Sequence, residues 1–99
     1  MPRMLIIDDE PASCRTLALH FGERGFDVET AHSAEQGLAE LDRAGADVVV
    51  SDIRMPGRDG LSLLAEIRQR FEATPVIMIT AFHDLDTTVA AMHGGAVDY

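Results

Sequence analysis

The 99-residue chain carries 8 basic and 17 acidic side chains, a formal net charge of −9, and 46% of its residues are hydrophobic. These numbers predict one small domain with a buried core and exclude a disordered chain. The longest apolar runs, "MLII", "VVV" and "VIMI", are too short to cross a bilayer, and no signal peptide is visible. The single Cys14 excludes an internal disulfide, so we expect a cytoplasmic protein. The acidic balance predicts no direct nucleic-acid binding.

The first half of the chain alternates short apolar strands with amphipathic helices. Residues 4–7 predict a strand, and residues 26–31 predict a second, half-exposed strand in which apolar and polar side chains alternate. Between them lies a predicted helix that ends at Gly25. Ser33 is the expected N-cap of the next helix. The apolar residues at helical spacing in the two helices are Cys14, Leu17, Ala18 and Phe21, and then Ala34, Leu38 and Leu41.

The second half repeats this alternation. Residues 47–52, "DVVVSD", predict a buried strand, and residues 75–80 predict another. The apolar positions of the helix expected between them are Leu61, Leu64, Ile67 and Phe71. Asp84 is positioned to cap a fourth helix, which would stop at Gly94.

Strands that alternate with short helices predict parallel pairing through right-handed crossovers. The apolar first, third and fourth strands fit a buried sheet, and the alternating second strand fits an edge. We therefore expect an α/β fold, a flavodoxin-like doubly wound parallel sheet with strand order 2-1-3-4. The terminal "AVDY" resembles the approach to a fifth strand, so strand 5 and helix 5 are expected to be missing or incomplete.

Acidic side chains follow two of the predicted buried strands. Asp8 and Asp9 end the first strand, Asp52 ends the third, and Thr80 ends the fourth. Ligands of open parallel sheets bind beyond the carboxyl ends of the strands, so these side chains should converge on one cleft. Carboxylates about 4 Å apart repel each other by roughly 4 kcal/mol at an effective dielectric of 20. A hard divalent cation such as Mg²⁺ would offset that repulsion.

Each of these features has a plainer interpretation. Acidic residues at a strand end often cap the following helix, and "DIRMPGRDG" at 52–60 could be an ordinary turn. Glu10 is expected to begin the helix or support the site rather than bind the cation directly. Cys14 is expected in the core. The four histidines, His20, His32, His83 and His93, share no metal-ligand spacing and are expected at surfaces or helix ends.

Taken together, "IIDDEP" at 6–11, "DIRMPGRDG" at 52–60, "PVIMITA" at 75–81 and "GGAVDY" at 94–99 resemble the receiver domain of two-component response regulators. The resemblance covers residues 1–99. In amino-acid sequence the chain is most similar to receivers that precede AAA+ activators of sigma-54-dependent transcription. It implies that Asp52 accepts a phosphoryl group and that Mg²⁺ is bound by Asp8, Asp9, Asp52 and the backbone carbonyl of Arg54. It also implies that Thr80 is the switch hydroxyl and Tyr99 the switch aromatic.

The expected function is that of a phosphorylation-controlled switch rather than an enzyme, with at most slow self-dephosphorylation. The implied partners are a sensor histidine kinase and a C-terminal output domain, plausibly one that regulates transcription. One alternative is a receiver-like interaction module that is never phosphorylated. A Mg²⁺-dependent phosphatase of the haloacid dehalogenase type is a further alternative, but those enzymes use Asp-x-Asp where this chain has adjacent acids.

The family usually has a Lys-Pro pair about three residues after the position of Tyr99, and this sequence ends at Tyr99. The lysine would pair with phosphoryl oxygens, so its absence would weaken activation. A missing last strand would also expose the backbone edge of the fourth strand. We therefore expect a homodimer or a strand-exchanged oligomer.

Overall fold

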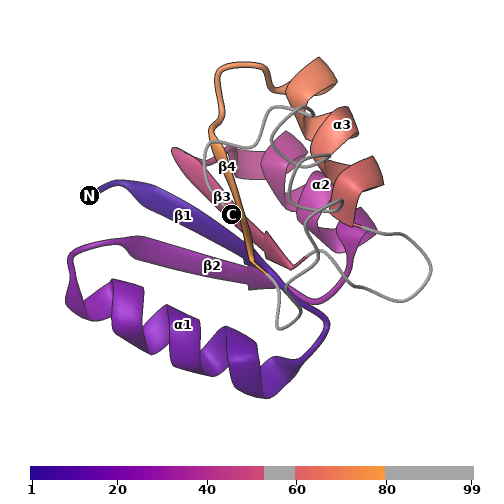
Figure 1. Ribbon diagram of the computed structural model, residues 1–99. Coiled ribbons are helices and arrows are strands. Elements are labelled where there is room, and N and C mark those ends of the chain that lie inside the picture. Colours follow the sequence, from indigo (N-terminus) through magenta and orange to yellow (C-terminus); the bar gives the residue numbers. More distant parts are fainter. Residues whose placement is uncertain (53–59, 80–99) are drawn as a thin grey trace.

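The computed structural model describes residues 1–52 and 60–79, which form four strands and three helices in alternation (Figure 1). The elements, in chain order, are β1 (Arg3–Ile7), α1 (Pro11–Glu23), β2 (Asp27–Ala31), α2 (Ala34–Ala44), β3 (Val48–Asp52), α3 (Gly60–Arg70) and β4 (Val76–Ile79). No helix within these ranges is long and apolar enough to cross a membrane.

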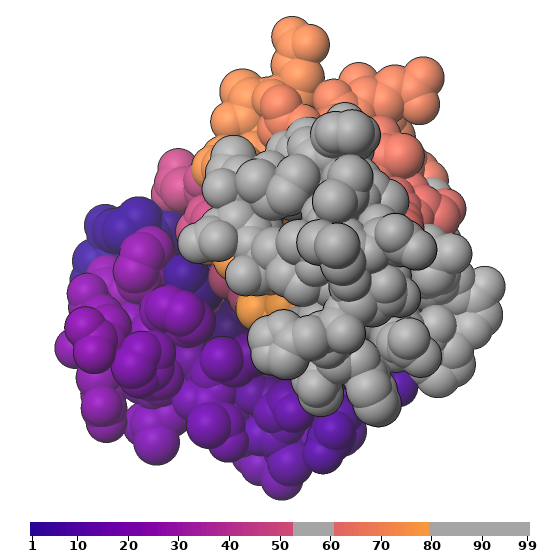
Figure 2. Space-filling view, viewed as in Figure 1, coloured from indigo at the N-terminus to yellow at the C-terminus, as the bar shows by residue number. Residues whose placement is uncertain are grey.

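The four strands form one parallel sheet with the order β2-β1-β3-β4, as predicted. α1 covers one face of the sheet, and α2 and α3 cover the other (Figure 1). In the space-filling view, the indigo and violet atoms of the first part of the chain lie on the opposite side from the orange atoms of α3 and β4 (Figure 2). The expected flavodoxin-like doubly wound fold is confirmed.

The two faces of the sheet bury separate apolar clusters, because alternate side chains of each strand point to opposite faces. On the α1 face, Met4, Ile6 and Val50 pack with Cys14. The larger cluster lies on the other face and contains these buried residues of the four strands and of α2 and α3: Leu5, Ile7, Ala31, Ala34, Leu38, Leu41, Val49, Leu63, Leu64, Ile67, Val76 and Met78. The sheet is therefore buried on both faces, as the continuous apolar runs of β1, β3 and β4 predict.

Local signals in the sequence fix the helix ends. Pro11 occupies the first turn of α1, where a missing N–H costs nothing, and Gly25 leaves the helix with a φ of 96°. The Ser33 Oγ caps α2 by accepting a hydrogen bond from the Gln36 N–H at 3.1 Å. The predicted cap at Ser33 and the predicted stop at Gly25 are both confirmed.

Gly37 of α2 packs tightly against Ile7 of β1. A Cβ built on Gly37 would lie 2.5 Å from Ile7 Cδ1 and 2.9 Å from Ile7 Cγ1, which is closer than real carbon atoms pack. Ile7 is fully buried, so it has little room to move away. Glycine at this position therefore allows α2 to lie directly on the carboxyl end of β1.

The observed boundaries differ little from the predicted ones. Phe71, expected on the last turn of the third helix, lies just after α3 and packs against the core from there. The predicted helix from Asp84 to Gly94, the approach to a fifth strand and Thr80 all lie outside the described residues.

Candidate metal centre

Three carboxylates meet at the carboxyl edge of the sheet. Asp8, Asp9 and Asp52 each offer an oxygen atom, and these atoms all lie within 4.8 Å of one another. Asp8 is buried at 5% exposure, Asp52 is half-buried, and Asp9 is exposed. The predicted convergence of these acids is therefore present in the structure.

The strand register explains this convergence. Ile7 of β1 pairs with Ala31 of β2 on one side and with Ser51 of β3 on the other. The residues that follow these three are Asp8, His32 and Asp52, and they therefore emerge together at one edge. Asp8 and Asp52 continue the side-chain alternation of Ile6 and Val50, so both carboxylates face the α1 side of the sheet.

Backbone hydrogen bonds hold Asp8 at this edge. Its N–H donates to the Ala31 carbonyl at 3.0 Å, and its Oδ1 accepts from the Glu10 N–H at 3.0 Å. Glu10 itself is the N-cap residue of α1 and makes no side-chain cap hydrogen bond. The alternative in which "DD" serves as a helix cap is therefore wrong for this chain, although Asp8 does order the turn that enters α1.

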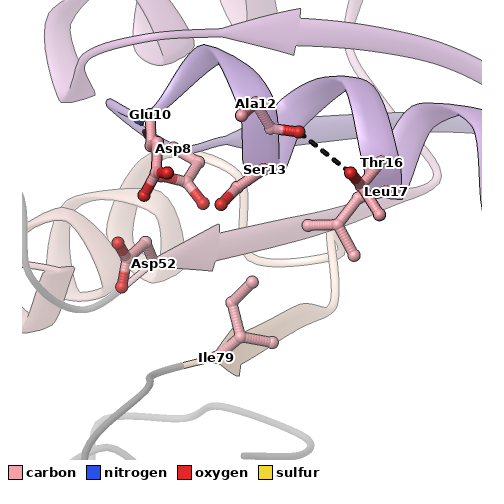
Figure 3. A pocket seen from close by; sticks show the side chains of 8 residues that line it. All are labelled: Asp8, Glu10, Ala12, Ser13, Thr16, Leu17, Asp52 and Ile79. Carbon is pink, nitrogen blue, oxygen red and sulfur yellow. Dashed lines mark hydrogen bonds between the residues drawn. The ribbon is translucent and has the colours of Figure 1, made fainter.

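A pocket of about 460 Å³ opens beside the acids. Asp8, Glu10 and Asp52 line one end, where their side chains lie near one another (Figure 3). The other lining residues come from α1 and β4 and are mostly small or apolar: Ala12, Ser13, Thr16, Leu17 and Ile79. The Thr16 hydroxyl donates within α1 to the Ala12 carbonyl at 3.0 Å (Figure 3). The pocket thus combines an acidic end with a less polar wall.

The donor set fits Mg²⁺ on chemical grounds. All three side chains supply hard oxygen atoms, which Mg²⁺ prefers over nitrogen or sulfur. Oxygen atoms within 4.8 Å of one another can share a single small cation. At that separation two carboxylates repel each other by roughly 3 kcal/mol at an effective dielectric of 20, and by less where water screens Asp9. A divalent cation between the carboxylates would attract all three and so offset their mutual repulsion.

Cys14 lies close to the acids but belongs to the core. Its side chain is 2% exposed and packs with Met4, Ile6 and Val50, as predicted. Burial, together with the negative charge of Asp8, raises the pKa of the Cys14 thiol. The thiol is thus kept protonated at neutral pH, and it donates a hydrogen bond to the Asp8 carbonyl at 3.3 Å.

Other predicted site residues fall outside the described ranges, namely Arg54, Thr80 and Tyr99, together with His83 and His93. Of the two described histidines, His20 lies edge-on to Phe21 at the surface of α1, as expected. His32 is exposed just before α2, as expected, and its Nδ1 also lies 3.3 Å from the Asp8 carbonyl oxygen and 3.6 Å from Cys14 Sγ. The available signal was its position directly after the second predicted strand, at the edge where the acids meet.

Comparison with known proteins identifies this arrangement. Residues 4–99 match the family described as the response regulator receiver domain. The chain therefore belongs to the receiver domains of two-component response regulators, and the sequence-based recognition is confirmed.

Individual relatives agree with this assignment. The chain is 37% identical to the transcriptional regulatory protein TrcR of Mycobacterium tuberculosis over 97 residues, covering 98% of this chain and 38% of TrcR. It is 40% identical to the regulatory protein AtoC of Escherichia coli over 97 residues, covering 98% of this chain and 21% of AtoC. The chain thus spans about two fifths of one relative and one fifth of the other.

Solved structures are similar over the whole chain. A response regulator receiver domain from Clostridium thermocellum has a TM-score of 0.94 and 33% identity, covering 100% of this chain and 80% of that one. The response regulator TrrA of Thermotoga maritima, solved in complex with Mg²⁺-BeF, has a TM-score of 0.91 and 31% identity, covering 100% of this chain and 84% of that one.

Proposed function

We propose that this receiver domain accepts a phosphoryl group on Asp52, from a histidine kinase, in a reaction that requires Mg²⁺. The observation that carries the proposal is the convergence of Asp8, Asp9 and Asp52 at the carboxyl edge of the sheet. Asp52 lies at the end of β3 and lines the open pocket, so a donor in solution can reach it. Asp8 is more deeply buried than Asp52, so it is better suited to cation binding than to attack.

The chemistry follows from the positions of these groups. An oxygen of the ionised Asp52 carboxylate attacks the phosphorus of a phosphohistidine, an O–P bond forms, and the P–N bond breaks. The imidazole nitrogen leaves with the bonding electrons and takes up a proton. Asp52 becomes an acyl phosphate, which adds negative charge and acceptor oxygens at the pocket. Positioning and electrostatics supply most of the rate in such transfers.

Asp8, Asp9 and Asp52 would hold the Mg²⁺ ion, with the Arg54 carbonyl as a further proposed ligand. When bound, the ion neutralises the nucleophile and the oxygens of the transferring group. Asp8 is fixed by two hydrogen bonds at 3.0 Å, so the site needs little reorganisation on binding. A Mg²⁺-BeF complex of the similar Thermotoga maritima protein supports this choice of cation.

The downstream response is proposed from the family resemblance. Thr80 would bind the phosphoryl group, and the movement of its hydroxyl would let Tyr99 turn inward. The domain would thereby control a C-terminal output domain in the cytoplasm, plausibly one of the sigma-54-dependent transcription activators. The domain itself would turn over no external substrate beyond its own slow dephosphorylation. A homodimer or strand-exchanged oligomer stays a prediction that light scattering would test.

Intact-mass measurement after incubation with acetyl phosphate and Mg²⁺ tests the proposal. We expect one phosphate adduct on the wild-type chain and none on Asp52→Asn or on wild type in excess EDTA. Asp27→Asn is the matched control, because Asp27 is an exposed aspartate of β2 away from the acids. It should be modified like wild type. A chain that remains unmodified, in a form extended past Tyr99 as well, would instead favour the interaction module.

A further inference from the structure

The carbonyl group of Asp8 has an unusual set of partners. β1 ends at Ile7, and the paired register with β2 ends with Ile7 and Ala31. The Asp8 carbonyl therefore lies beyond the strand ladder, although the residue is 95% buried. A buried carbonyl without a donor costs about 1–3 kcal/mol, so this group requires partners from elsewhere in the chain.

Two side chains from separate elements supply them. The Cys14 thiol on α1 lies 3.3 Å from the Asp8 carbonyl oxygen, and His32 Nδ1, after β2, lies 3.3 Å from the same oxygen. The carbonyl can only accept a hydrogen bond, so the ring contributes when its proton is on Nδ1. The two donors also contact each other, with Sγ 3.6 Å from Nδ1.

His32 is itself held in place by the start of α2. Its backbone N–H donates to Gln36 Oε1 at 2.8 Å, and the Gln36 N–H donates to Ser33 Oγ at 3.1 Å. These two hydrogen bonds join the turn between β2 and α2 to the first turn of α2, and they hold the backbone of His32 in place beside Asp8. The Asp8 peptide is thus tied to α1 through Cys14 and to the β2–α2 turn through His32.

We propose that His32 and Cys14 are positioning residues for the cation site, because they fix the Asp8 peptide and thereby the Asp8 carboxylate. The inference rests on the proposed Mg²⁺ site. The hydrogen bonds of the ring and the thiol go to the backbone carbonyl of Asp8, so they act by fixing the geometry of that peptide. Partners of metal ligands commonly change metal affinity by about 10- to 100-fold when removed.

Mg²⁺ titration of the full chain by calorimetry tests this with a graded set of His32 variants. His32→Asn places an amide nitrogen near the position of Nδ1, whereas His32→Gln places it near that of Nε2, and His32→Leu has no donor. We expect His32→Asn to bind within about twofold of wild type, and the Gln and Leu variants to bind about tenfold more weakly. His32 is exposed and the Cys14 thiol still donates to the Asp8 carbonyl in each variant, so all three should unfold near the wild-type urea midpoint without Mg²⁺.

Substitutions of Cys14 provide a second, matched pair of variants. Cys14→Ser retains a donor and should bind Mg²⁺ more tightly than Cys14→Ala, which removes it. The ring ¹⁵N spectrum of wild type should show the neutral His32 ring protonated on Nδ1. Each of these results supports the positioning role independently of phosphorylation.

The results that would overturn the positioning role differ from the result that would overturn the cation site itself. Leu and Gln variants of His32 that bind Mg²⁺ as tightly as the Asn variant would overturn the positioning role while leaving the cation site intact. Equal weakening in all three variants would also overturn it, because the donor position would then be irrelevant. A wild-type chain that binds no Mg²⁺ would remove both the positioning role and the proposed cation site.

Discussion

The two ends of the sheet differ in how their charged side chains are arranged: opposite charges pair at the amino end, and acids cluster at the carboxyl end. At the amino end, the Arg3 guanidinium donates to Glu40 Oε1 at 2.7 Å and to the Gly45 carbonyl at 2.8 Å. The backbone N–H of Arg3 donates to Asp47 Oδ2 at 2.7 Å, and the Arg43 guanidinium also pairs with Glu40. At the carboxyl end, Asp8, Asp9 and Asp52 gather acids of one sign.

This difference separates stability from function within one small domain. Opposite charges at the amino end join β1 to α2 and to the loop before β3, so they support the fold. Like charges at the carboxyl end repel one another and so oppose folding unless a bound cation offsets the repulsion. Substitutions at the amino end should therefore lower stability and leave Mg²⁺ binding unchanged. Substitutions of the acids at the carboxyl end should weaken Mg²⁺ binding and raise stability in the absence of the cation.

The largest expected effect comes from Asp8→Asn. Losing one buried carboxylate should weaken Mg²⁺ binding by roughly 100-fold, or about 2.7 kcal/mol. In EDTA the same variant should be more stable than wild type by about 1 kcal/mol, because repulsion is relieved and Asn retains the oxygen that accepts from Glu10. Urea unfolding with and without Mg²⁺ measures both changes. A loss of stability in EDTA would contradict the proposed repulsion.

Gly37→Ala tests the packing that brings α2 onto the carboxyl end of β1. The new Cβ would overlap Ile7, and we expect a net loss of about 1–2 kcal/mol after the gain in helix propensity is subtracted. Ile7→Val shortens the obstructing side chain and should recover part of the loss when combined with Gly37→Ala. Urea unfolding of the two single variants and the double variant gives this coupling. Strictly additive effects would show that the contact is not the cause.

Arg3→Ala should have a smaller effect, confined to stability. The Arg3 side chain is 22% exposed and also satisfies the Gly45 carbonyl, so we expect a loss of about 1 kcal/mol. Arg43→Ala is the matched control, since Arg43 pairs with the same glutamate but is 63% exposed. It should lower the urea midpoint less than Arg3→Ala does. Mg²⁺ affinity should stay unchanged in both variants, because the two arginines pair with acids at the amino end of the sheet and not with Asp8, Asp9 or Asp52.

The smallest effect concerns acid sensitivity at the amino end. Hydrogen bonds and charge from Arg43, and then from Arg3, hold the pKa of Glu40 below its usual value of 4.5. A carboxyl whose pKa is lowered by folding stabilises the protein above its unfolded pKa, and this contribution is lost as pH falls through the folded pKa. Glu40→Gln should therefore be less stable than wild type at pH 7, with a difference that shrinks below about pH 4.5. Urea midpoints at pH 7 and pH 3 measure it, and high salt should reduce the difference at pH 7.

Much of the fold was predictable because its signals are local. The apolar runs and helical spacings predict every described element to within a few residues. Ser33 begins α2 and Gly25 follows the end of α1, both as expected. The positions of Asp8, Asp9 and Asp52 after apolar strands were also sufficient to predict that these acids meet, since parallel strands end at a common edge. The alternative of a helix cap could not be rejected from sequence, because it depends on whether Glu10 or Asp8 takes the cap position.

The sequence by itself determined the alternation of strands and helices, their order in the sheet and the acids at its carboxyl edge. These follow from periodicity and from the handedness of parallel crossovers. Only the tertiary structure decided that His32 meets the Asp8 carbonyl across 24 positions of sequence, and that Gly37 must lack a side chain beside Ile7. Such contacts depend on strand register and on sub-ångström packing between distant segments, and neither leaves a periodic trace along the chain.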